Sequence, residues 1–414
     1  MRIEMPTPPP GVADAVAELR TTAAIRTRAR SLLARARAGE SSWFTVADDA
    51  MGTAAQQVAT TTVRRYPSLE IPFHSRWRHF EAGGVHRLDQ LTSAPAQADP
   101  AERTRSLIDV AVVSVLLDAG AGPEWRYREP DTGLTFARSE GLGVASWHAC
   151  GAGLFSGAPQ PRWRVDADGL AALTHERLAH AFDVGPGNRL VGLDGRLGLL
   201  RNLGTALRAR PDLFGEDARP GRIYDHLGAG TDTITAHEIL DVILAGFASI
   251  WPSPTRLDGV GLGDCWPHPA VTGAGLTNGW MPFHKLSQWL TYSLLEPFEW
   301  SGITVDGLDS LTALPEYRNG GLLLDTGVLR LRDDAWHART WRAGDELVVE
   351  WRALTVALVD ELAELVRDHL GVTATQLPLA CVLEGGTWAA GRELAQQLRN
   401  GLPPLTILAD GTVF

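Results

Sequence analysis

The chain has 414 residues, of which 21% are charged and 44% hydrophobic, and this composition excludes a disordered or collagen-like protein. A formal net charge of −11 argues against nucleic-acid binding as the main role, because that role needs a basic surface. No apolar run approaches about 18 residues, and the first residues lack a basic and apolar leader, so no membrane span and no secretory signal are expected. Three scattered cysteines, an odd number, indicate a reducing cytoplasm rather than a disulfide framework.

Most of the chain carries helical patterns. Ala, Arg and Leu recur at helical spacing near the N-terminus, and glycines end a long apolar stretch further on. A helix after residue 167 follows an aspartate able to cap it. Thr235 and Glu238 form a capping-box pattern at the start of another helix. The helices expected in chain order cover residues 12–38, 103–119, 168–182, 235–247 and 346–370.

Strand signals are few and short. A hairpin is expected over residues 125–136, around a Pro-Asp-Thr-Gly turn, and another at the chain's end, where Asp-Gly separates two apolar runs. The fold class is therefore mainly α, with short β hairpins. The best surface linker, residues 93–101, separates an N-terminal helical segment and polar loop (1–100) from a main helical catalytic region (101–414), unless the whole chain forms one integrated domain.

Lysine is nearly absent from this sequence. Lys and Arg together number 38, and a single one of them, Lys285, is lysine. In an Ala-, Gly- and Arg-rich chain, codon pressure replaces exchangeable lysines with arginine. A lysine that remains is a candidate for work that arginine's permanently charged, planar fork does not perform. The alternative is chance survival on the surface.

Polar chemistry gathers between residues 259 and 331, among prolines, glycines and tryptophans. Pro282 is expected to open a helix at its first turn. On that helix Lys285 and Gln288 are three apart and share a face, and Trp289 can wall a pocket beside them. The same stretch also holds Asp264, His268, His284, Glu316, Tyr317 and Arg318.

Several readings of this stretch stay open. Pro315 predicts a second helix start at Glu316, which Gly320 and Gly321 weaken or bend. Lys285 and Glu316 form either a functional or a structural ion pair, and Glu316 also suits the dipole of a helix start on the surface. A metal site is not expected, because the spacing of Asp264, Cys265 and His268 matches no complete four-ligand set.

A second polar cluster occupies residues 71–80. Arginine forks fit phosphate oxygens, so this segment is either a phosphate-binding loop or a solvated basic turn. A third segment, 140–157, is rich in small residues, which allow backbones to approach closely. The polar and aromatic residues of the second cluster are His74, Arg76, Trp77, Arg78 and His79.

Segments spread from about residue 70 to the C-terminus resemble the uracil-catabolism protein family of fungi and bacteria, long described as a domain of unknown function. They include HSRWRHFEAGG, GLGDCWPH, PFHKLSQWLTYSLLEPFEW, LPEYRNGGLLLDTGVL, EWRALTVALVDELA and LEGGTWAAGRE. The resemblance implies a role in the pathway that recovers uracil nitrogen as urea through ring opening and a ribosylurea species.

A shorter stretch of about 50 residues is similar to the queuosine-salvage nucleotide N-glycosylases. Lys285 and Gln288 match their Lys-x-x-Gln helix. A later element matches at Leu311, Thr312, Tyr317, Arg318, Gly327, Val328 and Leu329. Here Glu316 replaces the aspartate of that family, and Asn319-Gly320-Gly321 replaces its Val-Pro-Gln. This resemblance implies a helix-hairpin-helix DNA-glycosylase-like fold.

Together the resemblances imply an N-glycosidase that hydrolyses ribosylurea, or its 5′-phosphate, to urea and the sugar. A carboxylate near the anomeric carbon stabilises the oxocarbenium-like state. Glu316 is the candidate for that role, and Lys285 pairs with it or contacts the substrate. A general acid protonates the departing urea, with Asp264 the leading candidate and His268 or His284 the others. The expected substrate-binding residues are His284, Gln288, Tyr317, Arg318, His268, His74, Arg76, Arg78 and Trp289.

Two other functions stay open. One is an amide or ring-opened-pyrimidine hydrolase that uses Cys265 or a metal, and the other is a non-catalytic carrier of the ring-opened intermediate. No glycine-rich phosphate loop, HExxH or GxSxG motif is present, so no cofactor is expected. The expected partner is a small ribosyl or ribosyl-phosphate compound, with no nucleic acid and no membrane. The sequence does not settle the oligomeric state.

Overall fold

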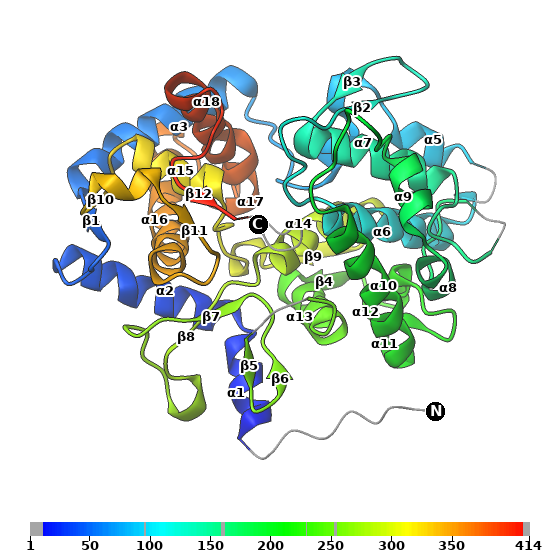
Figure 1. Cartoon of the computed structure of the whole chain (residues 1–414), viewed down its shortest axis with the longest axis horizontal. Helices are drawn as coiled ribbons and strands as arrows, with labels where there is room; N and C mark the ends of the chain where they lie inside the picture. Colours follow the sequence, from blue (N-terminus) through cyan, green and yellow to red (C-terminus); the bar gives the residue numbers. More distant parts are fainter. Residues whose placement is uncertain (1–10, 95–96, 159–161, 229, 252–254, 409–414) are drawn as a thin grey trace. The chain divides into compact units, whose positions relative to one another are not determined.

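The computed structural model describes residues 11–94, 97–158, 162–228, 230–251 and 255–408. Helices dominate these residues, and the strands are short, which confirms the expected mainly α class (Figure 1). The chain forms two compact units, each assembled from separate segments. Unit 1 comprises the described residues of segments 1–72, 253–285 and 309–408; unit 2 comprises those of segments 73–252 and 286–308.

Unit 1 is built around α16, whose bounds are those expected from its sequence pattern. Its residues 347–359 are all buried, because α2, α3 and α15 pack against it. Any charged side chain in this part of α16 must therefore find a partner inside the protein. The helices of unit 1 are α1 (Val12–Leu19), α2 (Thr22–Arg37), α3 (Met51–Arg65), α15 (Tyr317–Asp325), α16 (Glu346–Leu370), α17 (Leu379–Val382) and α18 (Trp388–Arg399), with a π-helical turn, η8 (Leu383–Thr387), before α18.

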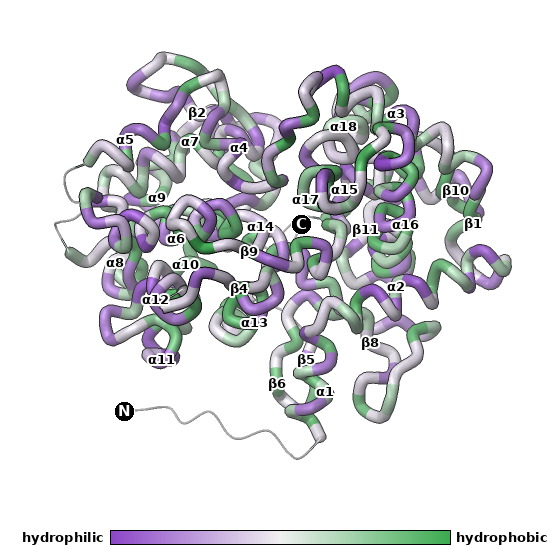
Figure 2. Tube along the Cα trace, turned by 180° about the vertical axis from the view of Figure 1, so that it is seen from behind, coloured by the Kyte–Doolittle hydropathy of each residue, from purple (hydrophilic) through white to green (hydrophobic). Residues whose placement is uncertain are grey.

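Unit 2 packs its helices in a similar way, with α6 against α7 and α10 against α8. Hydrophobic and hydrophilic residues alternate along the helices of both units, as expected where one face of a helix is buried (Figure 2). The helices of unit 2 are α4 (Trp77–Phe80), α5 (Leu88–Thr92), α6 (Pro100–Leu116), α7 (Arg138–Gly151), α8 (Ala167–Ala171), α9 (His175–Ala181), α10 (Leu193–Ala209), α11 (Pro211–Phe214), α12 (Ile223–Gly228), α13 (Ala236–Phe247) and α14 (Lys285–Trp300), whose first residue belongs to unit 1.

The described strands pair only in twos. The antiparallel pairs are β1 (Phe44–Val46) with β10 (Leu329–Leu331), β2 (Tyr127–Arg128) with β3 (Thr135–Phe136), β5 (Arg256–Leu257) with β6 (Val260–Gly261) and β7 (Cys265–Pro267) with β8 (Trp280–Pro282). The parallel pairs are β4 (Thr233–Thr235) with β9 (Thr304–Asp306) and β11 (Thr340–Trp341) with β12 (Thr406–Ile407).

Several expected elements are confirmed. The hairpin over residues 125–136 is present as β2 and β3, and Thr235 and Glu238 form both hydrogen bonds of a capping box on α13. The helix expected over 12–38 divides into α1 and α2, because the Thr21 side chain caps a new helix start. The helix expected over 168–182 divides into α8 and α9, capped by Asp166 and Thr174.

The expectation that Pro282 opens a helix is wrong. Pro282 ends β8, paired with Cys265, and α14 begins three residues later at Lys285. The C-terminal hairpin lies partly outside the described residues; its first half, β12, pairs with β11 instead. The first ten residues also lie outside the described part, as do two residues of the expected linker, whose last residues already begin α6.

The expected division at residue 100 falls inside unit 2, and it stays a prediction about domains rather than a boundary of these units. All three cysteines are buried thiols. Among the described helices, none combines the length and apolarity that crossing a bilayer requires.

Candidate functional site

Glu316 stands at the start of α15 and caps it. Its Oε2 accepts a hydrogen bond from the Arg318 backbone N–H at 2.7 Å, and its Oε1 accepts one from Asn319 N–H at 2.6 Å. Burial of the carboxyl group raises its pKa, while these two amides and the positive charge of Lys285 act to lower it. The structure therefore places Lys285 and Glu316 together in unit 1, where both residues are half-buried.

Asp264 organises the start of α14. Its carbonyl oxygen accepts hydrogen bonds from the backbone N–H groups of Phe283 at 2.9 Å and His284 at 3.1 Å. Its Oδ2 accepts one from Lys285 N–H at 3.0 Å. His284 adopts the left-handed conformation, with φ of 49°, which few residues other than glycine take without cost. The hydrogen-bonded backbone thus fixes the position from which the Lys285 side chain extends.

The Asp264 side chain is held as an anion by Arg352 of α16. Both guanidinium Nη atoms donate to the two carboxylate oxygens at 2.7 Å, and Trp266 Nε1 donates to Oδ1 at 2.8 Å. Burial raises the pKa of Asp264, but the charge and hydrogen bonds of Arg352, with those of the Lys285 amide and the Trp266 indole, more than offset it, so the pKa is lowered. A carboxylate held in this way favours a positioning role over that of a general acid. We call Asp264, Lys285, Glu316 and Arg352 the Glu316 centre.

Both candidate histidines of unit 1 are buried and held by the protein. The Nε2–H of His284 donates to the Leu19 carbonyl at 3.0 Å, and burial lowers the pKa of His284. The Nδ1 of His268 accepts from Ala270 N–H at 3.2 Å, which leaves the proton of the neutral ring on Nε2. That Nε2 lies 3.2 Å from Glu350 Oε2, without the geometry of a hydrogen bond.

His268, Glu346 and Glu350 bring one nitrogen and two carboxylate oxygens within 4.8 Å of one another, the one such set among the described residues. A metal-binding histidine normally donates its second N–H to an oxygen. His268 instead accepts an amide proton on that side, so Nε2 carries the hydrogen that a metal would displace. The donor set therefore fits a metal poorly.

The other predicted residues of α15 face different surroundings. The Arg318 guanidinium lies 4.7 Å above the Tyr317 ring and donates from Nη1 to the Gly401 carbonyl at 3.3 Å. The Nε of Arg318 is buried without a hydrogen-bond partner. Gly391 of α18 packs directly on the Arg318 carbonyl, where an added Cβ would lie 2.2 Å from that oxygen. Arg318 is thus a largely internal cation of unit 1.

Cys265 does not have the surroundings of a nucleophile. It is fully buried in β7, and burial together with the negative charge of Asp264 raises the pKa of its thiol. Since the thiolate is the reactive form, a raised pKa argues against the alternative in which Cys265 attacks an amide.

The basic segment predicted to bind phosphate lies in unit 2. Arg76 is fully buried: its Nε donates to Ser114 Oγ at 2.6 Å, and its Nη1 pairs with Asp118 Oδ1 at 3.0 Å. Its guanidinium lies 5.6 Å from the Trp289 ring of α14, and the His79 ring meets that indole edge-on at 5.9 Å. We call Arg76, His79, Asp118 and Trp289 the Trp289 cluster.

The Trp289 cluster holds several polar atoms without hydrogen-bond partners. They are Arg76 Nη2, His79 Nδ1 and Trp289 Nε1, while Asp118 Oδ1 meets Arg76 as an ion pair without the geometry of a hydrogen bond. Burial and the nearby positive charge of Arg76 lower the pKa of His79 to about 4, so the ring is neutral near pH 7. Because Asp118 already compensates Arg76, a phosphate at this place would meet a carboxylate as well as a cation.

The remaining predicted residues of unit 2 are mainly internal. Arg78 donates from Nη2 to Glu296 Oε1 at 2.8 Å, and Ser75 also hydrogen-bonds Glu296. His74 and Gln288 are buried. The structure thus brings Asp264, His268, His284, Lys285, Glu316, Tyr317 and Arg318 into unit 1, and His74, Arg76, Arg78, Gln288 and Trp289 into unit 2.

The small residues of segment 140–157 permit close helix packing. A Cβ on Gly143 of α7 would lie 2.8 Å from the His79 Cβ, and one on Gly141 would lie 2.9 Å from the Trp125 ring. The glycines therefore allow α7 to approach the backbone that carries His79, which supports a packing role for this segment.

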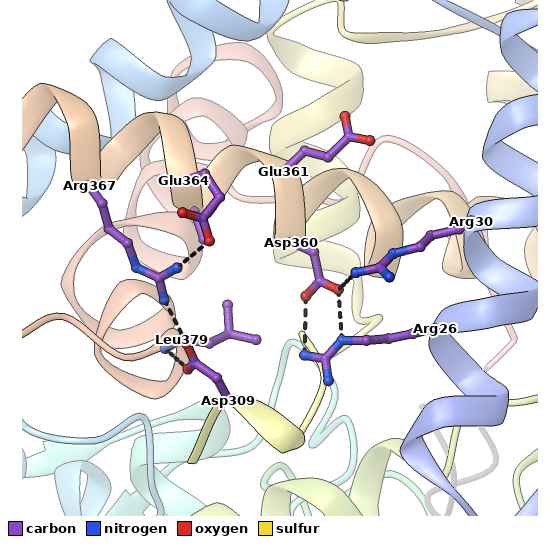
Figure 3. A pocket seen from close by; sticks show the side chains of 9 residues that line it. Arg26, Arg30, Asp309, Asp360, Glu361, Glu364, Arg367 and Leu379 are labelled. Atoms are coloured by element: carbon purple, nitrogen blue, oxygen red, sulfur yellow. Dashed lines mark hydrogen bonds and ion pairs between the residues drawn. The ribbon is translucent and has the colours of Figure 1, made fainter. Parts of the chain in front are cut away.

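A surface cavity of about 390 Å³ in unit 1 contains none of the predicted residues (Figure 3). Arg26 forms a fork with Asp360, and Arg367 pairs with both Asp309 and Glu364. These arginines already have carboxylate partners, so the cavity offers an anion little uncompensated positive charge. We call it the ion-pair cavity.

Sequence reasoning missed Arg352, Asp118 and Glu350. The signal for Arg352 was present, since it stands in the apolar run Trp351-Arg352-Ala353-Leu354 of a long helix. A charge on a buried helix face requires a partner. That partner, Asp264, lies 88 residues away in the chain, and the sequence pattern does not identify it.

Residues 18–414 match the profile of a family described as protein of unknown function, DUF1688. The chain is 40% identical over 377 residues to uracil catabolism protein 4 of Lachancea kluyveri, covering 83% of this chain and 85% of that protein. It is 42% identical over 351 residues to protein urg3 of Schizosaccharomyces pombe, covering 83% of this chain and 84% of that protein.

Proposed function

We propose that this chain, which belongs to the DUF1688 family, acts in uracil catabolism as an N-glycosidase. Its relative from Lachancea kluyveri is named for uracil catabolism and matches most of both chains, which supports the pathway. The proposed reaction hydrolyses ribosylurea, or its 5′-phosphate, to urea and ribose or ribose phosphate.

The observation that carries the proposal is the environment of Glu316. Its carboxylate is held by two helix amides next to the positive charge of the single lysine, Lys285. Cleavage of an N-glycosidic bond builds positive charge on the anomeric carbon, which a fixed carboxylate stabilises. The raised pKa of Glu316 also leaves it able to accept a proton from an attacking water.

The reaction balances without an additional reactant. The bond between the anomeric carbon and the urea nitrogen breaks, and its electron pair leaves with urea. Water adds its oxygen to the anomeric carbon, and its two protons are divided between the new hydroxyl and the departing nitrogen. Lys285 favours the ionised form of Glu316, because a nearby cation stabilises the charged carboxylate.

The test is proton NMR of the purified protein with ribosylurea and, separately, with ribosylurea 5′-phosphate. We expect urea release and loss of the anomeric signal, reduced by about 10³-fold in Glu316→Gln, because the stabilising charge is lost. The matched control is Glu364→Gln, a surface glutamate of α16, which should retain wild-type turnover. Intact ribosylurea and ribosylurea phosphate after prolonged incubation with folded protein would refute the proposal.

A further inference from the structure

Arg352 is the buried residue that connects the two halves of the Glu316 centre. Its side chain is 1% exposed, in the part of α16 that is buried on all sides. Its two Nη atoms donate hydrogen bonds to the Asp264 carboxylate, and its Nε donates to the Pro315 carbonyl at 3.3 Å. The guanidinium also lies over the Phe283 ring at 4.0 Å.

Each of these contacts leads to one of the two candidate functional residues. On one side, Asp264 accepts hydrogen bonds from three successive backbone amides, the last of which belongs to Lys285. On the other side, Pro315 is the residue directly before Glu316. One guanidinium therefore holds the backbone just before α14 and the backbone just before α15.

The rest of α16 strengthens this connection. Trp351, the residue before Arg352, donates from its indole Nε1 to the Gly320 carbonyl at 3.1 Å, in the first turns of α15. A Cβ on Gly320 would lie 2.7 Å from the Trp351 ring, so the close packing of these helices depends on glycine. Successive residues of α16 thus fix both α15 itself and the chain leading into it.

Only arginine satisfies this arrangement. The bond to Pro315 and the paired bonds to Asp264 use three nitrogens of one planar group, arranged as a rigid fork. A lysine at this position would supply a single ammonium, able to neutralise Asp264 but unable to hold Pro315 in the same plane. We propose that Arg352 is a positioning residue that fixes Lys285 relative to Glu316, a role that rests on the proposed function of these two residues.

The single lysine makes this proposal directly measurable. Protein grown with ¹³C-labelled lysine gives side-chain NMR signals from Lys285 and from no other residue. In the wild type, Glu316→Gln should shift the Lys285 signal, because the two groups interact electrostatically. In Arg352→Met we expect the Lys285 signal itself to move. The shift that Glu316→Gln then causes in this signal should be less than half of the shift it causes in the protein that keeps Arg352.

Activity supplies the second readout. We expect Arg352→Met to lower kcat by about 10- to 100-fold with a smaller change in KM, because misplacing a catalytic group costs the chemical step more than binding. Arg352→Lys should recover part of the fold stability but little of kcat. The matched control is Arg367→Lys, a second buried arginine of α16 that contacts Asp309, Glu364 and the Leu377 carbonyl. It should leave the Lys285 signal unchanged.

The outcomes separate this proposal from the proposed function. An unchanged Lys285 signal, with an undiminished response to Glu316→Gln, would overturn the positioning role of Arg352 whatever the activity. If the lysine signal behaves as expected but the wild type releases no urea, the positioning role stands and the N-glycosidase proposal fails. If Arg352→Met does not fold, Arg352→Lys tests the proposal by the same two measurements, the position of the Lys285 signal and its response to Glu316→Gln.

Discussion

The Glu316 centre and the Trp289 cluster are both groups of buried and half-buried polar side chains, but they satisfy their polar atoms differently. In the Glu316 centre, both carboxylate oxygens of Asp264 and both of Glu316 accept hydrogen bonds. In the Trp289 cluster, Arg76, His79 and Trp289 each leave one buried polar atom without a hydrogen-bond partner among the described residues, and Asp118 Oδ1 has an ion pair without hydrogen-bond geometry.

This difference indicates different uses of buried polarity. A fully satisfied network fixes the geometry of its members, as a catalytic arrangement requires, and removing one member exposes the others. A partly satisfied cluster costs stability unless water or a ligand completes it. The Glu316 centre should therefore be sensitive to every substitution, whereas the Trp289 cluster should tolerate loss of the unpartnered atoms.

Asp264→Ala should have the largest effect, because it leaves the Arg352 charge buried without its partner. We expect the free energy of unfolding to fall by about 3–5 kcal/mol in urea denaturation. The control is Asp48→Ala, in the exposed pair with Arg37, where we expect a loss below about 1 kcal/mol. Equal losses in the two variants would show that the Asp264–Arg352 pair does not hold the Glu316 centre together.

Lys285→Met tests the electrostatic part of the same centre. We expect kcat/KM for ribosylurea to fall by about 10- to 100-fold, because the carboxylate loses the cation that favours its ionised form. Since burial already raises the pKa of Glu316 and Lys285 acts against that shift, the variant should raise this pKa further. The acid limb of the pH profile should then move to higher pH.

The pH profile also identifies the group responsible. Lys285→Arg retains a positive charge and should leave the acid limb closer to its wild-type position than Lys285→Met does. A limb that stays in place in Lys285→Met, with kcat/KM lowered equally at every pH, would assign Lys285 to substrate contact rather than to control of Glu316.

The regular part of this fold was accessible from the sequence because it depends on local signals. The long helix α16 and the capping box of Thr235 and Glu238 follow from helical spacing and short-range hydrogen bonds. The expectation for Pro282 is wrong for a nonlocal reason: Pro282 pairs in β8 with Cys265, and the helix begins only at Lys285, whose N–H donates to Asp264.

The candidate site was predicted by residue type more than by arrangement. The lone lysine and the proline before Glu316 are visible signals, and they point to Lys285 and Glu316, which both lie in the Glu316 centre. The pairing of Arg352 with Asp264 joins residues 88 positions apart in the chain, which sequence periodicity does not reveal. The separation of the expected residues into two units likewise follows from the tertiary packing of discontinuous segments.

Trp289 of the Trp289 cluster can be compared with Trp77, another tryptophan of unit 2. Trp77 donates from Nε1 to the Ser293 carbonyl at 2.9 Å, whereas Trp289 Nε1 has no hydrogen-bond partner. Both rings are largely buried, so substitution by phenylalanine removes similar volume from each site. We expect Trp77→Phe to cost about 1 kcal/mol more than Trp289→Phe, because only the former leaves a carbonyl unsatisfied. Thermal and urea denaturation would measure the difference, and a larger cost at Trp289 would show that its N–H is satisfied in solution.

A substitution in the ion-pair cavity should have the smallest effect on stability, and it provides a reference for the other variants. Glu364 is 71% exposed and pairs with Arg367, which keeps Asp309 and the Leu377 carbonyl as further partners. Glu364→Ala should therefore change the free energy of unfolding by less than about 0.5 kcal/mol, and added salt should reduce the change, because solvent and ions screen exposed pairs. A loss as large as that of Asp264→Ala would mean that exposure does not separate the two kinds of ion pair in this protein. A small loss at Glu364 and a large one at Asp264 would establish that burial, rather than the number of charge contacts, determines which network holds unit 1 together.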